Sequence, residues 1–248
     1  ISVLNVTDGD AALLQVPCPI SAWPGCVELA PETVLPLPDG LAPIKALPSA
    51  HDETKAFLIG CCNILIDAED DLNALDAKSG DGDTGSTLSA AARALVVAMD
   101  SLPLADHTQL YRAIGQELSQ TMGGSSGVLL AIFFAAAGDA SSSGMPMRQA
   151  LMAGLERMQE IGGARPGDRT MIDALLPALT ALEDSLAAAA KAARAGADHT
   201  ATLTRANAGR ASYINAEQLQ GHVDPGAEAV ARLFGHLSAQ SPLDPQVS

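Results

Sequence analysis

From residue 51 onward, apolar side chains recur at helical spacing, and no stretch alternates in the manner of a β-strand. The clearest run lies between Asp52 and Ala77. Its apolar face consists of Phe57, Leu58, Cys61, Leu65, Ala68, Leu72 and Leu75. Alanine and leucine dominate this part of the chain, and aromatic residues make up only 3% of the whole, a composition that favours helix. The sequence therefore predicts an all-α fold.

Glycine, proline and capping residues divide this region into about eight helices. We place them at residues 52–77, 84–100, 105–121, from the 122–127 turn to about 137, 146–160, from 168 onward, within 184–207, and 224–238. Asp168 is interpreted as the N-cap of the sixth helix. Residues 138–144 are interpreted as a loop, and residues 213–223 as irregular. Short connections make neighbouring helices antiparallel.

The first fifty residues have a different character. Residues 1–6 alternate like a strand, residues 7–10 (Thr-Asp-Gly-Asp) are typical of a turn, and residues 11–15 suggest a short helix. Eight prolines between residues 17 and 48 favour an extended connector. We therefore expect residues 1–20 to be the tail of a preceding domain of a larger polypeptide, residues 21–50 a Pro-rich linker and residues 51–248 the helical domain.

The net charge of −15 and the pI of about 4.5 argue against nucleic acid and against an acidic membrane as partners. An acidic protein can still bind a nucleotide when metal ions carry the positive charge. The four cysteines fit no zinc spacing, and Cys61 and Cys62 lie in a helical pattern as core thiols. With no signal peptide and no long apolar run, the expected location is cytoplasmic.

Three aspartates stand close together between the first two predicted helices, in the stretch LNALDAKSGDGDTGSTL from Leu72 to Leu88. Asp76 falls in the last turn of the incoming helix, and Asp81 and Asp83 lie in the glycine-rich turn that opens the outgoing one. Converging carboxylates repel each other unless a cation separates them, and their oxygens suit Mg²⁺. The following helix N-terminus favours an anion. Together these features predict a Mg–phosphate site.

A plainer interpretation makes this stretch only a turn, with Asp83 capping the next helix. The stretch is not a calcium-binding EF-hand, because the twelfth position counted from Asp81 is Ala92 where that loop requires glutamate. The chain also contains no Gly-x-x-x-x-Gly-Lys-Ser/Thr phosphate loop.

Antiparallel helices bring alternate loops to the same end of the domain. The glycine-rich loops at residues 80–85, 123–127, 162–170 and 209–226 all fall at one end by this count. The loops near Pro103 and Ser141 fall at the other and carry less chemistry. The topology thus predicts that the candidate phosphate, metal and base contacts lie together at one end of the domain, which we call the predicted mouth.

Residues 123–127 (Gly-Gly-Ser-Ser-Gly) match the Gly-x-Ser-x-Gly motif of hydrolases, but that motif follows a strand, and the residues before it are predicted to be helical. We favour a phosphate-binding turn at a helix start, with a simple helix–helix turn as the alternative. None of the five histidines has a metal-ligand spacing. His222, in the predicted mouth, is the one placed to reach a ligand.

Five motifs in order resemble the nucleotide-binding domain of the dihydroxyacetone kinase family. They read LNALDAKSGDGDTGST, GGSSG, GDRTMIDALLPAL, GRASY and GHVDPGA, and the resemblance covers about residues 51–240. It implies a barrel of eight amphipathic antiparallel helices, preceded here by the tail of a substrate-binding domain and the linker. The segment 182–204 is shorter than is typical of the family, so the seventh helix departs from the pattern.

Carried over by position, the resemblance implies a site for ATP or ADP with two Mg²⁺ ions. The metal ligands would be Asp76, Asp81 and Asp83. The phosphate contacts would be Thr84, Gly85, Ser86, Thr87, Gly123, Gly124, Ser125 and Ser126. The adenine would lie against Thr170 and Met171 with Gly162 nearby, and the pocket would be completed by Arg210, Asp224, Pro225 and Gly226.

The resemblance also implies an ATP-dependent kinase that transfers the γ-phosphate to dihydroxyacetone or glyceraldehyde. In the family the ketone is held covalently by a histidine of the other domain, and this chain offers no candidate for it, so the chain would be the donor half only. One alternative is a subunit of the same fold that keeps ADP bound and is rephosphorylated by a carrier protein. A remote alternative is a non-catalytic helical interaction module. The sequence also leaves open a homodimer and an apolar guest inside the barrel.

Overall fold

The computed structural model describes residues 7–14, 16 and 46–240. It divides the chain into two compact units, residues 1–44 and residues 45–248. The predicted strand at residues 1–6 and most of the proline-rich connector lie outside the described residues. The limits of the predicted linker and domains therefore stay predictions.

The described part of the first unit is the helix α1 (Asp8–Leu14). Its start is a reciprocal cap: the Thr7 amide donates to Asp10 Oδ2 at 2.9 Å, and the Asp10 amide donates to Thr7 Oγ1 at 3.3 Å. The expectation of a separate turn at residues 7–10 was wrong, because this mutual capping makes Asp8–Asp10 the first helical turn.

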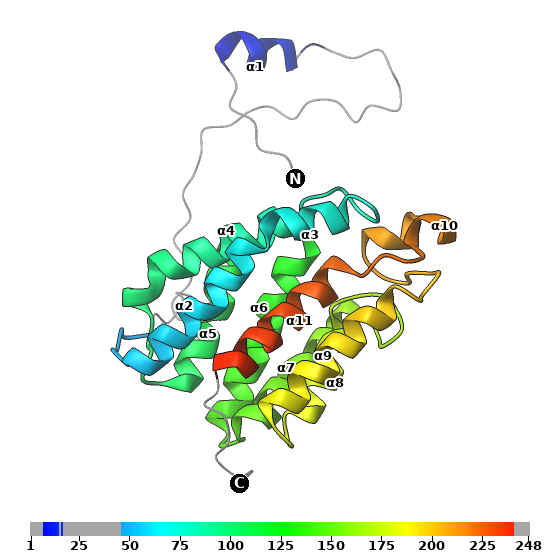
Figure 1. Cartoon of the computed structure of the whole chain (residues 1–248). Coiled ribbons are helices and arrows are strands. Elements are labelled where there is room, and N and C mark those ends of the chain that lie inside the picture. Colours follow the sequence, from blue (N-terminus) through cyan, green and yellow to red (C-terminus); the bar gives the residue numbers. More distant parts are fainter. Residues whose placement is uncertain (1–6, 15, 17–45, 241–248) are drawn as a thin grey trace. The chain divides into compact units, whose positions relative to one another are not determined.

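The described residues of the second unit form helices joined by loops, with one isolated bridge and no named strand among them (Figure 1). The elements are α2 (Asp52–Asp67), α3 (Glu69–Asp76), α4 (Thr84–Ala98), η1 (Met99–Ser101), α5 (His107–Thr121), α6 (Gly124–Ser142), α7 (Met147–Gly162), α8 (Ile172–Ala181), α9 (Leu186–Thr200), η2 (Arg210–Tyr213), α10 (Ala216–Leu219) and α11 (Pro225–Gln240). The all-α prediction is confirmed for these residues.

Several predicted boundaries were wrong. The first helix is divided at Ala68, where ψ is 0°. The sixth begins at Ile172 rather than Asp168. Part of the segment expected to be irregular forms α10, whereas the seventh helix, α9, lies within the predicted range 184–207. Helix α6 continues through Gly138 to Ser142, because the glycine lets Arg112 and the Thr108 carbonyl of α5 approach closely.

Successive helices pack against one another along the chain. Contacts run from α2 and α3 to α4, then to α5, α6, α7, α8 and α9, and α11 packs on α9 and also returns to α2 and α3. Figure 1 shows α11 lying between α2 and α9. The last helix thus brings the two ends of the described helical unit together.

The core is built mainly from alanine and leucine, with a few phenylalanine residues among them. One cluster joins α6, α7, α8, α9 and α11 around Phe133, Leu155 and Leu179, and a second joins α4 and α5 with residues 99–104. The partly buried Leu130 and Phe134 of α6 touch both clusters. By length and composition α6 could also cross a membrane, and in this structure it packs against α5 and α7.

Two features mark the start of this unit. Ser49 pairs through its backbone with the segment before α5: its amide donates to the Leu102 carbonyl at 3.2 Å, and its carbonyl accepts from the Leu104 amide at 3.0 Å. In α2, Cys62 is buried and Cys61 is partly buried, and both are free thiols, as predicted. Burial raises the pKa of each thiol to about 11.

Candidate functional site

Three carboxylates meet where α3 ends and α4 begins. Asp76 is the last residue of α3, and Asp81 and Asp83 belong to the loop that follows. One oxygen atom from each lies within 4.8 Å of the others. Asp76 is buried, whereas Asp81 and Asp83 are exposed to solvent. Three acidic groups this close repel one another, and a hard divalent cation with oxygen ligands would remove that repulsion.

Asp76 is fixed by the backbone of the loop. Its Oδ2 atom accepts hydrogen bonds from the amides of Gly82 and Asp83 at 3.0 Å and of Thr84 at 3.2 Å. Gly82 has a φ of +81°, which lets the loop turn back onto the carboxylate. A side chain at Gly80 would overlap the carboxylate itself. The Oδ1 atom has no hydrogen-bond partner among the described residues, so an oxygen ligand remains available for an ion.

Asp83 occupies the N-cap position of α4, but its side chain makes no capping hydrogen bond. The interpretation in which Asp83 merely caps the helix therefore does not describe this carboxylate. Asp76 does part of that work instead, by accepting from the Thr84 amide. The side chain of Asp83 stays within the acidic cluster.

The first turn of α4 is pinned to α3 by a network that the sequence pattern did not reveal. The Ser86 amide donates to Asn73 Oδ1 at 3.0 Å, and Asn73 Nδ2 donates to the Ser86 hydroxyl at 2.9 Å. The Ser86 hydroxyl donates to Glu69 at 3.2 Å, and the Ser89 hydroxyl does so at 2.6 Å. A side chain at Gly85 would overlap the Glu69 carbonyl. Gly85 and Ser86 therefore face α3.

The second predicted phosphate contact lies at the start of α6. Residues 123–126 are exposed, and Gly124 has a φ of +70°. Neither Ser125 nor Ser126 makes a side-chain hydrogen bond to the part of the chain that the structure describes. The element before this turn is the helix α5, where a hydrolase nucleophile turn requires a strand. The turn opens the helix α6, which agrees with both the phosphate-binding turn and the simple helix–helix turn.

The loop between α7 and α8 is organised by Asp173. Its carboxylate accepts hydrogen bonds from the amides of Gly167 and Thr170. The predicted cap Asp168 instead accepts from the Arg165 amide at 2.7 Å and from Asn207 Nδ2 at 2.8 Å, which ties this loop to the segment after α9. The expectation that Asp168 caps α8 was therefore wrong.

Asp224 caps α11 from a buried position. Its Oδ2 atom accepts from the Ala227 amide at 2.8 Å, and its own amide donates to Thr200 Oγ1 at 2.8 Å. Burial raises the pKa of its carboxyl to about 6, although the charge of Arg169 acts in the opposite direction. Asp224 is thus more readily protonated than an exposed aspartate.

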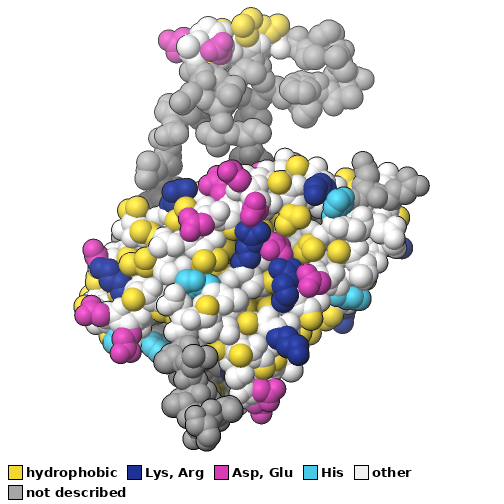
Figure 2. Space-filling view, viewed as in Figure 1, with side chains coloured by type: hydrophobic (Ala, Val, Ile, Leu, Met, Phe, Trp, Pro, Cys, Tyr) yellow, Lys and Arg dark blue, Asp and Glu magenta, His cyan; other side chains and the backbone are white. Residues whose placement is uncertain are grey.

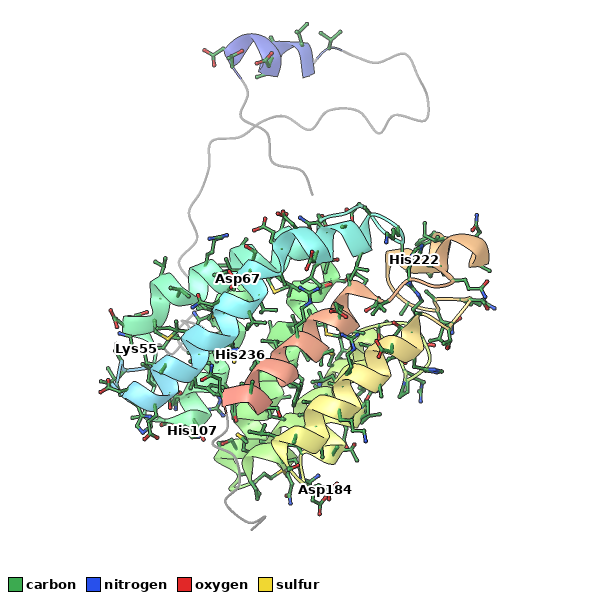
Figure 3. All side chains as sticks on the ribbon, in the orientation of Figure 1. Lys55, Asp67, His107, Asp184, His222 and His236 are labelled. Carbon is green, nitrogen blue, oxygen red and sulfur yellow. The ribbon has the colours of Figure 1, made fainter. Side chains whose placement is uncertain are left out.

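The two segments expected to flank the base touch each other. A Cβ atom built on Gly226 would lie 3.2 Å from Met171 Cβ, so the turn before α8 packs on the start of α11. Gly162 is the last residue of α7 and packs against Leu129 of α6. Arg210 begins η2. The half-buried His222, labelled in Figure 3, accepts a hydrogen bond from Arg169 through its carbonyl oxygen.

These segments lie at one end of the helices. In Figure 1 the loop between α3 and α4, the start of α11 and the short α10 all lie at the upper right of the helical unit, whereas the loop between α6 and α7 lies at the opposite end. The space-filling view shows acidic and basic side chains interspersed over the face that carries α2 and α11 (Figure 2). Within it, Arg232 bonds Glu228 at 2.8 Å and Asp71 at 2.9 Å.

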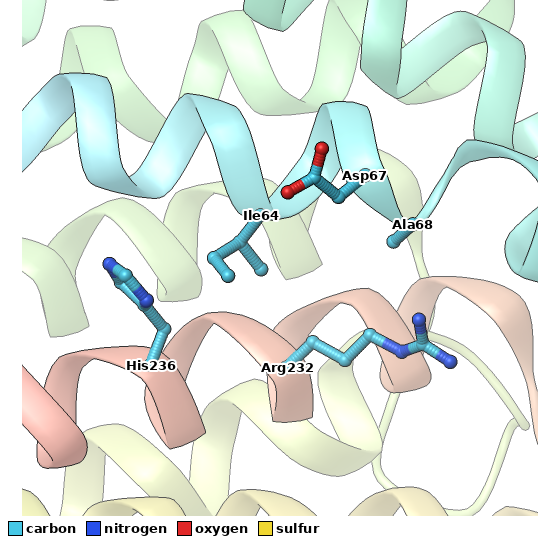
Figure 4. A pocket seen from close by; sticks show the side chains of 5 residues that line it. All are labelled: Ile64, Asp67, Ala68, Arg232 and His236. Carbon is cyan, nitrogen blue, oxygen red and sulfur yellow. The ribbon is translucent and has the colours of Figure 1, made fainter.

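A separate surface cavity of about 390 Å³ lies between α2 and α11 (Figure 4). Its lining residues are Ile64, Asp67, Ala68, Arg232 and His236. It contains none of the residues predicted to bind metal or nucleotide. The predicted site is instead formed by loops and helix starts.

Comparison with known proteins gives consistent matches. The sequence matches the DAK2 domain family over residues 78–239. It is 46% identical over 223 residues to a dihydroxyacetone kinase of Citrobacter freundii, covering 88% of this chain and 40% of that protein. It is 36% identical over 258 residues to a triokinase/FMN cyclase of Bos taurus, covering 94% of this chain and 44% of that protein.

The structure resembles two crystal structures of the C. freundii dihydroxyacetone kinase. The native form superposes with a TM-score of 0.74 at 41% identity, over 94% of this chain and 43% of that one. The form in complex with AMP-PNP and Mg²⁺ gives a TM-score of 0.72 at 40% identity, over 94% and 42%. This chain therefore spans about two fifths of the length of these relatives.

Proposed function

This chain belongs to the DAK2 domain family, and we propose that it is the Mg–nucleotide-binding domain of a kinase that phosphorylates dihydroxyacetone or glyceraldehyde. The observation that carries the proposal is the convergence of Asp76, Asp81 and Asp83 within 4.8 Å. A related structure in complex with AMP-PNP and Mg²⁺ supports ATP and Mg²⁺ as the ligands.

The carboxylate donors fit a hard cation. All three offer oxygen, and the exposure of Asp81 and Asp83 lets an ion arrive with its water and with phosphate oxygens. Asp76 is held in place before any ion binds, because three backbone amides fix one of its oxygens. We propose that these residues hold two Mg²⁺ ions against the nucleotide phosphates.

The remaining contacts divide by element. Ser125 and Ser126 at the start of α6 are exposed and would donate to phosphate, as would the first turn of α4. Within that turn Gly85 and Ser86 face α3, so their proposed role is to place the turn as well as to contact the ligand. Thr170, Met171 and Gly162 would lie by the adenine, with Arg210 and residues 224–226 completing the pocket.

The chemistry asked of this domain is mostly positioning. Phosphoryl transfer develops charge on the phosphate oxygens, and bound Mg²⁺ would offset part of that charge. The chain's own residues would orient the triphosphate through helix N-termini and fix the carboxylates. The packing of α11 on α2 and α3, which joins the ends of the helical unit, supports the proposed barrel.

We propose that the chain is the donor half of the reaction. The acceptor would be held on a substrate domain, and the relatives are more than twice as long as this chain. Residues 1–248 alone should therefore bind Mg–ATP without phosphorylating dihydroxyacetone. Robust turnover by this chain alone would contradict the assignment. A cytoplasmic location remains our expectation.

The alternative within the same fold is a subunit that keeps ADP bound and receives phosphate from a carrier protein. The rate of nucleotide exchange separates the two, since a co-substrate must exchange quickly. An apolar guest in the barrel and a homodimer also remain to be tested. Mass spectrometry of extracted protein and sedimentation would test them.

The direct test is calorimetric titration of Mg–ATP into the chain and its variants. Asp81→Asn and Asp83→Asn should each weaken binding by about tenfold or more, because each removes a charged ligand (about 1.4 kcal/mol per tenfold). Asp70→Asn is the matched control, since this exposed carboxylate of α3 lies outside the cluster. Unchanged affinity in the two cluster variants would refute the metal site.

A further inference from the structure

Arg169 is the largest side chain that is almost fully enclosed, with 1% of its surface exposed. Its backbone has a φ of +62°, and it is the one non-glycine residue with positive φ in the described chain. Its Nη2 atom donates to the His222 carbonyl at 2.8 Å. Its Nε and Nη1 atoms have no hydrogen-bond partner among the described residues.

Such an arrangement is a poor means of stabilising a fold. A buried donor without a partner loses the hydrogen bonds that it would make to water, and a left-handed backbone is unfavourable for a residue that has a Cβ atom. Burial also lowers the pKa of the guanidinium, opposed by the charge of Asp224. A residue kept at this expense calls for a reason beyond packing.

The contacts of Arg169 indicate that reason. Its backbone belongs to the loop before α8, directly before Thr170 and Met171. Its side chain reaches the turn before α11, where it bonds the His222 carbonyl and interacts through charge with Asp224. The loop before α8 and the turn before α11 also touch each other directly, where Met171 packs on Gly226.

We infer that Arg169 is a positioning residue for the adenosine side of the proposed nucleotide site, holding the Thr170–Met171 turn against the Asp224–Gly226 turn. The inference rests on the proposed function and extends it to a residue that need not touch the nucleotide. The carboxylate cluster is held by other contacts, between α3 and α4. Loss of Arg169 should therefore affect recognition of adenosine and spare recognition of Mg–phosphate.

The test compares two ligands that share the phosphate chain. Mg–ATP and Mg–tripolyphosphate are titrated into the wild type, Arg169→Met, Arg169→Lys and the control Arg148→Met. Arg148 forms an ion pair with Glu183 at 3.2 Å, near the end of α8 that lies away from the site. Arg169→Met should weaken Mg–ATP about tenfold and Mg–tripolyphosphate less than about twofold, on the scale of 1.4 kcal/mol per tenfold.

Arg169→Lys keeps the charge on a shorter side chain, and its affinity for Mg–ATP should fall by about threefold, which is intermediate between the wild type and Arg169→Met. The control should leave both affinities unchanged. An equal loss for the two ligands in Arg169→Met, or no loss for either, would overturn the inference. If Arg169→Met does not fold, Arg169→Lys decides, and an affinity ratio equal to that of the wild type would overturn it.

Hydrogen exchange without nucleotide gives a second readout. The amides of Asp224 and Ala227 should exchange faster in Arg169→Met, because Asp224, which lies in the turn that Arg169 holds, donates its amide to Thr200 and accepts from the Ala227 amide. The amides of Asp83 and Thr84, bonded to Asp76, should be unchanged. Uniform or absent changes would overturn the coupling. If the wild type binds no Mg–ATP, both the proposed function and the nucleotide role of Arg169 are wrong. The hydrogen-exchange data would still decide whether Arg169 couples the two turns.

Discussion

Two regions at the loop end of the helices bring charged groups together in opposite ways. Between α3 and α4, three groups of the same sign converge, and two of them are exposed. Between the α8 and α11 starts, Arg169 and Asp224 carry opposite charges and both are buried. Water screens the exposed group of like charges until a cation arrives, whereas buried charges must be compensated within the protein. Only the first region is therefore suited to an incoming metal ion.

The largest effect should come from the residue that serves both the fold and the proposed metal site. Asp76→Ala removes the acceptor of three backbone amides and should lower the free energy of unfolding by about 3 kcal/mol, at about 1 kcal/mol for each bond. Asp83→Ala, which removes no capping bond, should change it by less than about 0.5 kcal/mol. Urea unfolding measures both. Equal losses would mean that Asp76 is not the organiser of the loop.

The next largest effect on stability should come from the close packing of α4 against α3 at Gly85. Gly85→Ala places a methyl group on the Glu69 carbonyl and should cost about 2 kcal/mol, because the helices must separate. Gly123→Ala is the control, since no atom lies within 4 Å of its added methyl group and its φ of −78° suits alanine. Thermal unfolding that finds the two variants alike would contradict this packing.

The stability that Asp224 contributes to the buried region should depend on pH. Because burial raises the pKa of Asp224 from 3.8 to about 6, the folded chain binds the proton more tightly, and stability from this group falls as pH rises between those values. Relative to Asp224→Asn, the wild type should lose about 2 kcal/mol between pH 4 and pH 7, at about 1.4 kcal/mol per pKa unit.

Glu228 provides a second test, because its pKa is shifted in the direction opposite to that of Asp224. Burial raises its pKa, but hydrogen bonds from Arg194 and Arg232 outweigh burial and leave the pKa below 4.5. Relative to Glu228→Gln, the wild type should gain stability as pH rises through the acid range. Denaturant unfolding at a series of pH values measures both differences, and parallel slopes for the two variants would contradict these assignments.

The smallest effects distinguish two serines at two helix starts. Ser86→Ala should cost about 1 kcal/mol of stability, because its hydroxyl bonds Asn73 and Glu69. Ser125→Ala should cost less than about 0.5 kcal/mol, because that hydroxyl is exposed, and should weaken Mg–ATP binding by about threefold. If Ser86→Ala weakens Mg–ATP binding and Ser125→Ala does not, then the start of α4 rather than the start of α6 binds the phosphates.

Helical spacing and glycine positions were enough to predict the all-α fold, and most helices were placed within a few residues. The errors arose where one residue overrode local preference. The helix is divided at Ala68 although the apolar pattern of the sequence is continuous there. Helix α6 continues through Gly138 because α5 packs closely against that glycine. The second effect is not visible in a local pattern, because it depends on the helix that packs against Gly138.

The acidic cluster could be predicted because its three members share one short loop. The contacts of Asn73 and Glu69 could not, since they depend on the register of α3 against α4. Arg169 was equally hidden: an arginine beside Asp168 is typical of a surface turn, and only the tertiary structure shows it buried. Long-range burial was thus the main information that the sequence pattern lacked.

The central claim is that Asp76, Asp81 and Asp83 form a divalent metal site that receives a nucleotide. Anomalous diffraction from crystals grown with Mn²⁺ and a non-hydrolysable ATP analogue tests it directly, because manganese replaces magnesium and can be located. We expect anomalous density in contact with oxygens of all three carboxylates, with the triphosphate reaching towards the start of α6. Density elsewhere, such as in the cavity lined by Asp67 and His236, with the three carboxylates empty, would contradict it.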